Sequence, residues 1–366
     1  MIDVIAFYLP QFHPIPENDK WWGEGFTEWT NVARANKLFK GHYQPRIPAD
    51  LGFYDLRIPE VREKQVMLAK EAGVTAFCYW HYWFGNGKQL LEKPLQEVVS
   101  QGKPDFPFML GWANHSWHTK NWNVVQSSYI STTLIEQSYP GKQDIINHFN
   151  TMLPVFKDKR YYKINGKLAF LIYQVENIPD FLLFKQIWNH LAKEQGLPEF
   201  FFIGYSEEDN KLSKSAYVNM DANCLCRLNV RNLSTNNSFF KRLYRYTKSH
   251  VFHVPANVVE YTDVITSNDS QLYDNEKIYP AVIPNWDPSP RRGLNSLIYN
   301  NSTPDLFYKH VKRILLRIQK KEEKNRIIFL KSWNEWAEGN YMEPDLKWRK
   351  GYIQALRRAL DEFNNE

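Results

Sequence analysis

Two carboxylates stand three residues apart in the segment "KSWNEWAEGNY" (Lys331 to Tyr341), where Glu335 and Glu338 lie among two tryptophans. Cleavage of a glycosidic bond needs one carboxylic acid that protonates the departing oxygen and a second carboxylate that acts as nucleophile or base. The indole rings and the preceding apolar run "RIIFL" would exclude water and raise the pKa of one acid. The pattern favours glycoside chemistry; the alternative is a loop whose acids cap the following turn.

A second set of candidate residues lies at the ends of apolar, strand-like runs. Others lie within the long segment after the first of these runs. Aromatic faces suit the C–H surfaces of sugar rings, and Asn, His, Tyr and carboxylate groups suit sugar hydroxyls. Aromatic residues make up 16% of the chain, which supports this interpretation. The predicted substrate contacts are Tyr8, His13, Trp22, Trp29, His81, Trp112, Asn114, Trp117, Tyr173, Trp286, Asp287, Arg291, Trp333, Asn334 and Trp336.

Other catalytic chemistries have weaker support in the sequence. His115 and His118 are spaced as HxxH, and His13 and His81 could join them in a metal site. However, no cysteine supports these histidines as a further metal ligand, and Trp-rich surroundings are unusual for structural zinc. A serine hydrolase of the GxSxG type would carry a motif that this sequence lacks. We therefore expect no metal ion and no cofactor.

The candidate residues must be positioned by a fold with several strands. The runs predicted as strands span residues 3–12, 74–80, 106–112, 168–174, 201–206, 222–228, 279–286 and 326–333. The helices predicted around them span residues 58–71, 90–100, 143–156, 181–194 and 348–363. Eight strands alternating with helices favour a (β/α)₈ barrel of the TIM type, whose active site lies at the C-terminal ends of the strands. A doubly wound open sheet is the alternative, but no glycine-rich phosphate loop follows the first strand.

Two long segments interrupt this pattern, from His13 to Asp50 and from Asn229 to about Glu276. Neither segment is of low complexity, and both carry aromatic residues. We interpret them as ordered loop insertions after strands one and six. No domain boundary is evident, so we expect residues 1–366 to form a single catalytic barrel.

The bulk composition is that of an ordinary folded protein, with 43% hydrophobic residues and a formal net charge of +6 over 366 residues. This mild, scattered charge disfavours nucleic acid as a partner. No apolar run approaches the ~20 residues of a membrane span, and "MIDVIAFYLPQFH" has no signal-peptide features. Cys78, Cys224 and Cys226 contain no CxxC pair and are interpreted as buried thiols, which favours the cytoplasm.

The chain resembles the WbsX-type proteins, a group similar to glycoside hydrolase family 99. The matching segments are "YLPQFH", "WWGEGFTEW", "GWANHSW", "WDPSPRRG" and "WNEWAEG", in this order over nearly the whole chain. The resemblance implies a (β/α)₈ barrel that cleaves internal α-mannosidic linkages with retention and without a metal ion. It also implies that Glu335 removes the proton of the sugar 2-hydroxyl, which attacks the anomeric carbon to give a 1,2-anhydro sugar. Glu338 would protonate the departing oxygen and later activate water.

WbsX-type proteins are also associated with bacterial surface polysaccharides, such as O-antigen and capsule, and have been labelled glycosyltransferases. Two enzyme classes therefore stay open: a glycoside hydrolase or transglycosidase, and a glycosyltransferase that uses a nucleotide sugar. The sequence has no convincing donor motif beyond the weak "EED" of Glu207 to Asp209. A non-catalytic glycan-binding protein is disfavoured because both acids are present. Asp287 and Glu176 are reserve candidates for the catalytic acids.

Basic and aromatic residues alternate between Arg231 and His250, in the insertion after strand six. One interpretation is a surface helix whose aromatic residues pack on the barrel. The other is a contact for a phosphate-bearing or lipid-linked glycan, because basic amphipathic segments suit anionic head groups. We expect an oligosaccharide or polysaccharide substrate, with peripheral membrane contact as the finer hypothesis.

Overall fold

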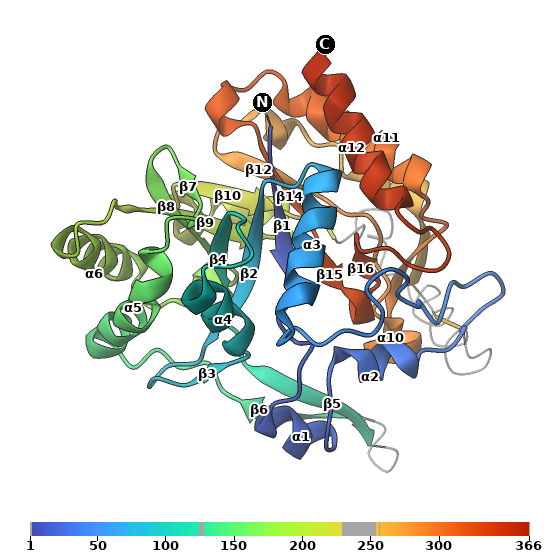
Figure 1. Ribbon diagram of the computed structural model, residues 1–366, viewed down its shortest axis with the longest axis horizontal. Helices are drawn as coiled ribbons and strands as arrows, with labels where there is room; N and C mark the ends of the chain where they lie inside the picture. Colours follow the sequence, from blue (N-terminus) through green and yellow to red (C-terminus); the bar gives the residue numbers. More distant parts are fainter. Residues whose placement is uncertain (1, 124–127, 229–253, 256, 366) are drawn as a thin grey trace.

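The computed structural model describes residues 2–123, 128–228, 254–255 and 257–365. In this part of the chain, eight parallel strands close into a barrel, because the first strand pairs with both the second and the eighth (Figure 1). The barrel strands are β1 (Asp3–Tyr8), β2 (Ala76–Trp83), β4 (Phe108–Trp112), β8 (Lys167–Ile172), β9 (Phe200–Ser206), β10 (Ala222–Leu225), β12 (Ile278–Val282) and β14 (Ile327–Leu330). The predicted (β/α)₈ barrel is thereby confirmed.

Helices follow the strands and cover the outside of the barrel (Figure 1). The main ones are α3 (Pro59–Ala72), α4 (Lys93–Gln101), α5 (Lys142–Phe156), α6 (Phe181–Glu194), α7 (Ser215–Val218), α9 (Tyr261–Ser267), α11 (Pro304–Ile318) and α12 (Gly351–Asn365). Gly73 ends α3 with a φ of +86°, a left-handed conformation that favours glycine. A Cβ atom there would lie 2.7 Å from the side chain of Leu360 in α12, so Gly73 also lets these two helices approach closely.

Side chains of the barrel strands alternate between the interior of the barrel and the layer beneath the helices. Phe7 of β1 points inward, where its ring centroid lies 4.8 Å from that of Trp80 and 5.3 Å from that of Phe329. The next residue, Tyr8, lies on the outer side and donates a 2.7 Å hydrogen bond to Gln65 of α3. Both faces of the strands are therefore buried, which explains their continuous apolar runs.

The C-terminal ends of the strands carry the longest connections, as predicted for strands one and six. The first insertion contains α1 (Pro16–Trp22) and α2 (Glu28–Ala33). The sixth strand is followed by a segment that includes β11 (Asn257–Glu260), which pairs in parallel with β13 (Leu297–Asn300). The basic segment from Arg231 to His250 lies outside the described residues.

The connection after the third barrel strand was not predicted: it forms a hairpin of β5 (Trp117–Asn123) and β6 (Ser128–Ile135). This hairpin lies beside α1 (Figure 1), where the ring centroids of Trp21 and Trp117 are 6.0 Å apart. The remaining short elements are β3 (Gln89–Leu90), β7 (Lys163–Ile164), α10 (Ser289–Arg292), β15 (Asn334–Glu335), β16 (Asn340–Tyr341) and the 3₁₀ turns η1 (Val175–Asn177), η2 (Asp209–Ser213), η4 (Gln271–Asp274), η5 (Gly293–Asn295), η6 (Glu323–Asn325) and η7 (Trp336–Glu338).

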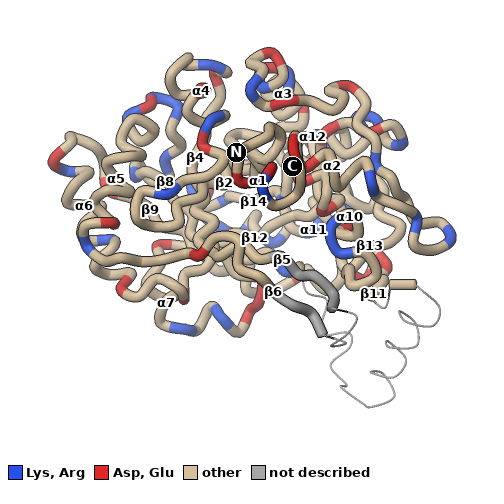
Figure 2. The backbone as a smooth tube through the Cα atoms, turned by 90° about the horizontal axis from the view of Figure 1, so that it is seen from below, with Lys and Arg blue, Asp and Glu red and all other residues tan. Residues whose placement is uncertain are grey.

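The distribution of charged residues agrees with the small net charge of the sequence. Figure 2 shows basic and acidic residues interspersed along the described backbone, without a stripe of one sign. Cys78, Cys224 and Cys226 are buried and form no disulfide with one another. Within the described residues, no helix has both the length and the apolar character needed to cross a membrane.

Candidate active site

The acid pair lies on one tight turn after the eighth barrel strand. After Leu330, the chain enters β15, which pairs antiparallel with β16 around the 3₁₀ turn η7. Gly339 closes this turn with a φ of +61°, which favours glycine. A Cβ atom there would lie 2.8 Å from the Cβ of Asp287. The ExxEG spacing therefore places Glu335 and Glu338 on one short turn at the barrel mouth.

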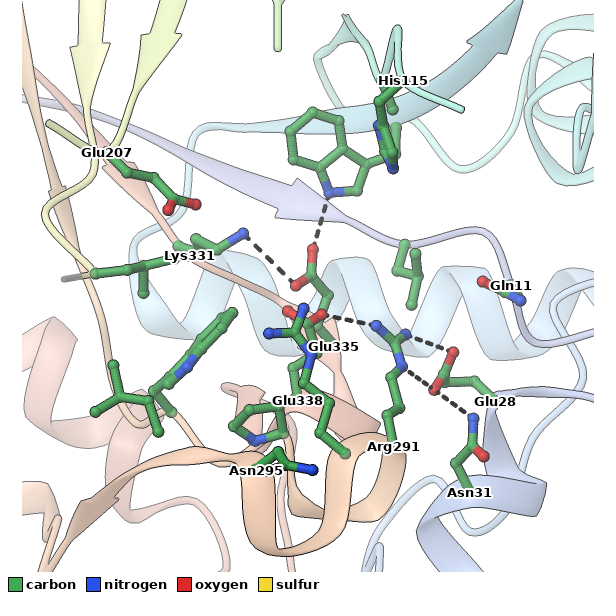
Figure 3. A pocket seen from close by; sticks show the side chains of 18 of the residues that line it. Gln11, Glu28, Asn31, His115, Glu207, Arg291, Asn295, Lys331, Glu335 and Glu338 are labelled. Atoms are coloured by element: carbon green, nitrogen blue, oxygen red, sulfur yellow. Dashed lines mark hydrogen bonds and ion pairs between the residues drawn. The ribbon is translucent and has the colours of Figure 1, made fainter. Parts of the chain in front are cut away.

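Both acids line a pocket of about 1280 Å³ at the C-terminal ends of the strands. Figure 3 shows Glu335 and Glu338 side by side, with Lys331 on one side of the pair and Arg291 on the other. The aromatic lining residues are Trp22, Phe26, Trp80, Tyr82, Trp117, Tyr173 and Trp286. The pocket thus combines a central acid pair with flat apolar walls.

Glu335 is the more deeply buried member of the pair, with 5% of its surface exposed. Its Oε1 accepts a 2.8 Å hydrogen bond from the indole of Trp80, and its Oε2 lies 3.7 Å from the ammonium of Lys331. Burial raises the pKa of Glu335, the positive charge of Lys331 opposes this, and the negative charge of Glu338 adds to it. A carboxyl group with a raised pKa is suited to exchange protons.

Glu338 is held by an arginine that bridges two carboxylates. The NH1 group of Arg291 donates a 2.7 Å hydrogen bond to Glu338, and its Nε and NH2 groups donate to both oxygens of Glu28, at 2.9 and 2.6 Å (Figure 3). Burial alone would raise the pKa of Glu338, but the charges of Arg291 and Lys331 outweigh it and lower the pKa. Glu338 is therefore the member of the pair that ionises more readily.

The two carboxyl groups also act on each other: the charge of Glu338 raises the pKa of Glu335, and contact with Glu335 lowers the pKa of Glu338. Like charges side by side disfavour full ionisation of a pair, so a proton on one carboxyl group stabilises the other as a carboxylate. The raised pKa of Glu335 and the lowered pKa of Glu338 favour Glu335 as the site of such a proton. Its use by Glu338 would need a transfer between the two carboxyl groups.

Asp287, a predicted substrate contact and reserve acid, does not line the pocket. It is fully buried, and its Oδ2 lies 2.9 Å from Nε2 of His42 and accepts a 2.7 Å hydrogen bond from Gln44. Burial opposes ionisation, but the contact with His42 and the charge of Arg46 lower the pKa of Asp287. Its carboxylate therefore attaches the first insertion to the barrel and is occupied by these partners.

The structure brings part of the predicted contact set together at the pocket. Trp22, Trp117, Tyr173, Trp286 and Arg291 line it with the two acids. The predicted contacts that do not line it are Tyr8, His13, Trp29, His81, Trp112, Asn114, Asp287, Trp333, Asn334 and Trp336, all of which are buried. The reserve acid Glu176 is exposed and forms an ion pair of 2.5 Å with Lys214 outside the pocket.

Three of the buried residues lie on the outer face of their strands. Tyr8 faces α3, as described above. His81 faces α5, where its Nε2 lies 2.8 Å from Nε2 of His148. Trp112 donates a 2.9 Å hydrogen bond from its indole to the carbonyl of Trp83 and packs against Phe184 of α6. These side chains stabilise the contact between barrel and helices.

The other buried residues hold the loops of the barrel mouth in place. The indoles of Trp29 and Trp336 donate hydrogen bonds to the carbonyl of Tyr54 at 2.7 Å and to Glu343 at 2.6 Å. Asn334 pairs with both backbone groups of Leu9, at 2.7 and 3.0 Å.

Two further predicted contacts bond to backbone groups nearby. Asn114 accepts a 2.7 Å hydrogen bond from the backbone N–H of Gln174, and Nδ1 of His13 lies 3.1 Å from the carbonyl of Pro10. Trp333 is fully buried in the core. These residues support the site from behind.

Several polar residues of the pocket were not among the predicted substrate contacts, and Glu28, Asn31, Glu207 and Lys331 are four of them. Lys331 was detectable, because it lies two residues after the inward-facing Phe329 and therefore on the same face of an extended chain. Burial raises the pKa of Glu207, while the charge of Lys331 opposes this. Glu28 and Asn31 come from the first insertion, and no strand alternation indicates their direction.

Only two of the four histidines of the predicted alternative metal site line the pocket. His115 and His118 line the pocket, whereas His13 and His81 do not. Within the ranges that the structure describes, no group of three or more His, Cys, Asp or Glu side chains is arranged to hold a metal ion.

Comparisons with known proteins agree over nearly the whole chain. The family model described as "Glycosyltransferase WbsX" matches residues 4–356. An "Uncharacterized protein WxcX" from Xanthomonas campestris pv. campestris is 33% identical over 364 residues, which cover 98% of this chain and 49% of that protein. The chain thus spans about half the length of the curated relatives it matches.

Solved structures show the same fold at low sequence identity. The GH99 endo-α-mannosidase from Bacteroides thetaiotaomicron is 17% identical, with a TM-score of 0.57 and coverage of 100% of this chain and 99% of that one. A structure described as a glycoside hydrolase-like protein is 14% identical, with a TM-score of 0.59 and coverage of 99% and 94%. At this identity the likeness concerns the fold.

Proposed function

The chain belongs to the WbsX family, and from this premise we propose that it is a retaining glycoside hydrolase or transglycosidase that acts on an α-linked glycan. The observation that carries the proposal is the adjacent pair of Glu335 and Glu338, whose pKa values are shifted in opposite directions, in the barrel-mouth pocket. A pair of carboxyl groups with pKa values shifted in opposite directions is the arrangement that acid–base catalysis on a glycosidic bond requires.

In the proposed first step, Glu335 takes the proton of the sugar 2-hydroxyl, and the 2-oxygen attacks the anomeric carbon. The bond from that carbon to the departing oxygen breaks as Glu338 gives its proton to that oxygen. In the second step Glu338 takes a proton from water, the water oxygen opens the 1,2-anhydro ring, and Glu335 returns its proton to the 2-oxygen. The first step needs a proton on Glu338, whereas the pKa shifts favour that proton on Glu335, so it must first pass across the pair.

The walls of the pocket support an oligosaccharide as the substrate. Its volume of about 1280 Å³ exceeds the ~300–1,000 Å³ typical of sites for small ligands. Trp22 is 43% exposed at the rim, in contact with the pocket, and offers an aromatic face to a sugar ring. We extend the proposal to internal linkages of the mannose type, by analogy with the GH99 endo-α-mannosidase that shares the fold.

The alternative is the glycosyltransferase activity that the family description names. Charge in the pocket disfavours a nucleotide diphosphate donor, because acidic residues outnumber basic ones among the described lining residues. The acidic residues are Glu28, Glu207, Glu260, Asp263, Glu335 and Glu338, and the Lys and Arg residues are Arg291, Arg292 and Lys331. We propose residues 1–366 as one catalytic barrel, with surface polysaccharide metabolism as its setting on the basis of the family association.

The test is product analysis on a panel of α-1,2-, α-1,3- and α-1,6-linked mannose oligosaccharides, with and without added nucleotide sugars. We expect mass spectrometry to detect shortened or transferred oligosaccharides without any nucleotide sugar. A strict requirement for a nucleotide sugar, with no cleavage or transglycosylation of any α-linked glycan, would replace this proposal with the transferase.

A further inference from the structure

A buried lysine stands beside the acid pair inside the barrel mouth. Lys331 is 5% exposed, and its Nζ lies between four aromatic rings, at 5.7 Å from Phe7, 5.9 Å from Trp80, 5.7 Å from Tyr205 and 5.6 Å from Trp286. Ring faces attract an ammonium ion, but burial of a charge is costly unless it is paired. A lysine at this position therefore needs a carboxylate partner.

That partner is Glu335, whose Oε2 lies 3.7 Å from the Lys331 ammonium. Arg291 lies on the opposite side of the pair, at 2.7 Å from Glu338 (Figure 3). The acid pair thus lies between two cations: Arg291 is the strongest source of the lowered pKa of Glu338, and Lys331 is the strongest influence that opposes the raised pKa of Glu335, although its charge also lowers the pKa of Glu338. Glu28 accepts hydrogen bonds from the Nε and NH2 groups of Arg291. The NH1 group of Arg291 donates to Glu338.

Other titratable or charged groups facing Lys331 or Glu335 are Tyr82, Tyr173, Glu207, Cys224, Cys226, Arg291 and Glu338. Burial raises the pKa values of the tyrosines and cysteines, which keeps them uncharged. Lys331 is therefore the cation that opposes protonation of Glu335 most directly.

We propose that Lys331 is a positioning residue: its ammonium, 3.7 Å from Glu335, stabilises the ionised form of Glu335 and so favours movement of the shared proton to Glu338. This inference rests on the proposed roles of the two acids, because it explains how the pair reaches the protonation state that the first step needs. Lys331 acts through Glu335 and need not touch the substrate.

The test measures the titration of Glu335 directly and without a substrate. Protein labelled with ¹³C at the glutamate carboxyl carbons is titrated by NMR, and the Glu335 signal is assigned by its loss in Glu335→Gln. Lys331→Met removes the charge with little change in volume, and Lys331→Arg keeps the charge. Lys331→Gln takes the place of Lys331→Met if the latter does not fold.

A matched control is available at the other end of the barrel. Lys321 is also buried, its Nζ lies 5.7 Å from the ring of Tyr279, and it hydrogen-bonds to the carbonyl of Ile278 at the start of β12. Lys321→Met therefore removes a buried, ring-contacting ammonium that lies far from the acid pair along the strands. It measures the effect of lost packing and lost charge in general.

In Lys331→Met we expect the midpoint of Glu335 to rise by about 1–3 pH units, the range for loss of an adjacent opposite charge. The midpoint should stay near the wild-type value in Lys331→Arg and in Lys321→Met. An unshifted midpoint in the folded Lys331→Met or Lys331→Gln protein overturns the inference, as does an equal shift in Lys321→Met. A shift supports the inference even if no glycan is cleaved, whereas absence of cleavage overturns only the proposed function.

Discussion

The backbone N–H of Asp287 donates a 2.6 Å hydrogen bond to the carbonyl oxygen of Glu338. This bond joins the segment after the seventh strand to the turn that carries the acids. The carboxylate of Asp287 meanwhile binds His42 and Gln44 of the first insertion and lies 3.6 Å from Arg46. One residue therefore connects three separate segments directly behind the acid pair.

Asp287→Ala should lower the free energy of unfolding by about 3–5 kcal/mol, because it leaves Arg46 buried without its counter-ion. Urea denaturation measures this change, and activity should fall with it as the acid turn loses its support. Asp287→Asn keeps the shape of the side chain and should retain part of both properties. A fully stable but inactive Asn variant would instead favour Asp287 as a reacting acid.

Glu335→Gln and Glu338→Gln should each reduce turnover of the α-linked substrate by at least ~10²–10⁴, the usual contribution of a group that transfers protons. Folding and glycan binding should persist, because the amide has the shape of the carboxyl group. Initial rates and thermal melting test both statements. Glu176→Gln is the matched control, since Glu176 lies outside the pocket and pairs with Lys214; near-normal turnover in either acid variant would remove that acid from the mechanism.

Trp22 and Trp29 belong to the same insertion, but their substitution should affect different properties: glycan binding for Trp22 and stability for Trp29. Trp22→Ala should weaken glycan binding by about 1–3 kcal/mol with little effect on stability, because its ring is exposed at the pocket rim. Trp29→Ala should instead lower stability by about 3–5 kcal/mol, since that ring is buried against Phe12 and Trp336. Calorimetric titration and denaturation distinguish the two, and unfolding of Trp22→Ala would place its ring in the core.

Stability should decrease in acid because of the buried His81–His148 pair. Burial lowers the pKa of His81 to about 3 and lowers that of His148 as well, whereas an unfolded imidazole titrates near 6.5. The unfolded chain then binds more protons below about pH 6.5, so the free energy of unfolding falls as pH decreases toward 3, by up to ~1.4 kcal/mol per pH unit for each histidine.

Urea denaturation between pH 7 and 4 tests this dependence. His81→Gln should reduce the slope, because one of the two imidazoles is gone and the amide still reaches His148. The control is His190→Gln, which changes an exposed histidine paired with Glu194 on α6. Equal slopes in the wild type and in His81→Gln would mean that these imidazoles accept protons in the folded protein.

The architecture was predictable because its signals are local. The helix predicted at 181–194 is α6 with the same bounds, since Asp180 caps its start and Gly196 follows its end. The hairpin of β5 and β6 was not predicted, because it lies beyond the barrel end and its first strand, "WHTKNWN", lacks an alternating apolar pattern. Helix α11 was also not assigned, although Thr303 and Pro304 mark its start.

The site was predictable only in part, because its residues depend on which face of a strand points inward. His81 was predicted as a contact, but its neighbours Trp80 and Tyr82 line the pocket, and Ala113 lines it in place of Trp112. A shift of one residue exchanges the two faces, and both faces of a buried parallel strand are apolar. The acids were accessible to prediction since they lie on a single turn, where sequence spacing and spatial proximity agree.

The closure of the barrel between β1 and β14, reinforced by the clamp of Asn334 on Leu9, has a consequence for biosynthesis. The ribosome delivers the turn with both acids more than three hundred residues after the first strand. The first strand therefore lacks one of its two barrel neighbours until the eighth strand has been synthesised, and the reactive centre is completed only by that strand. Catalytic competence should thus appear abruptly, once the eighth strand closes the ring.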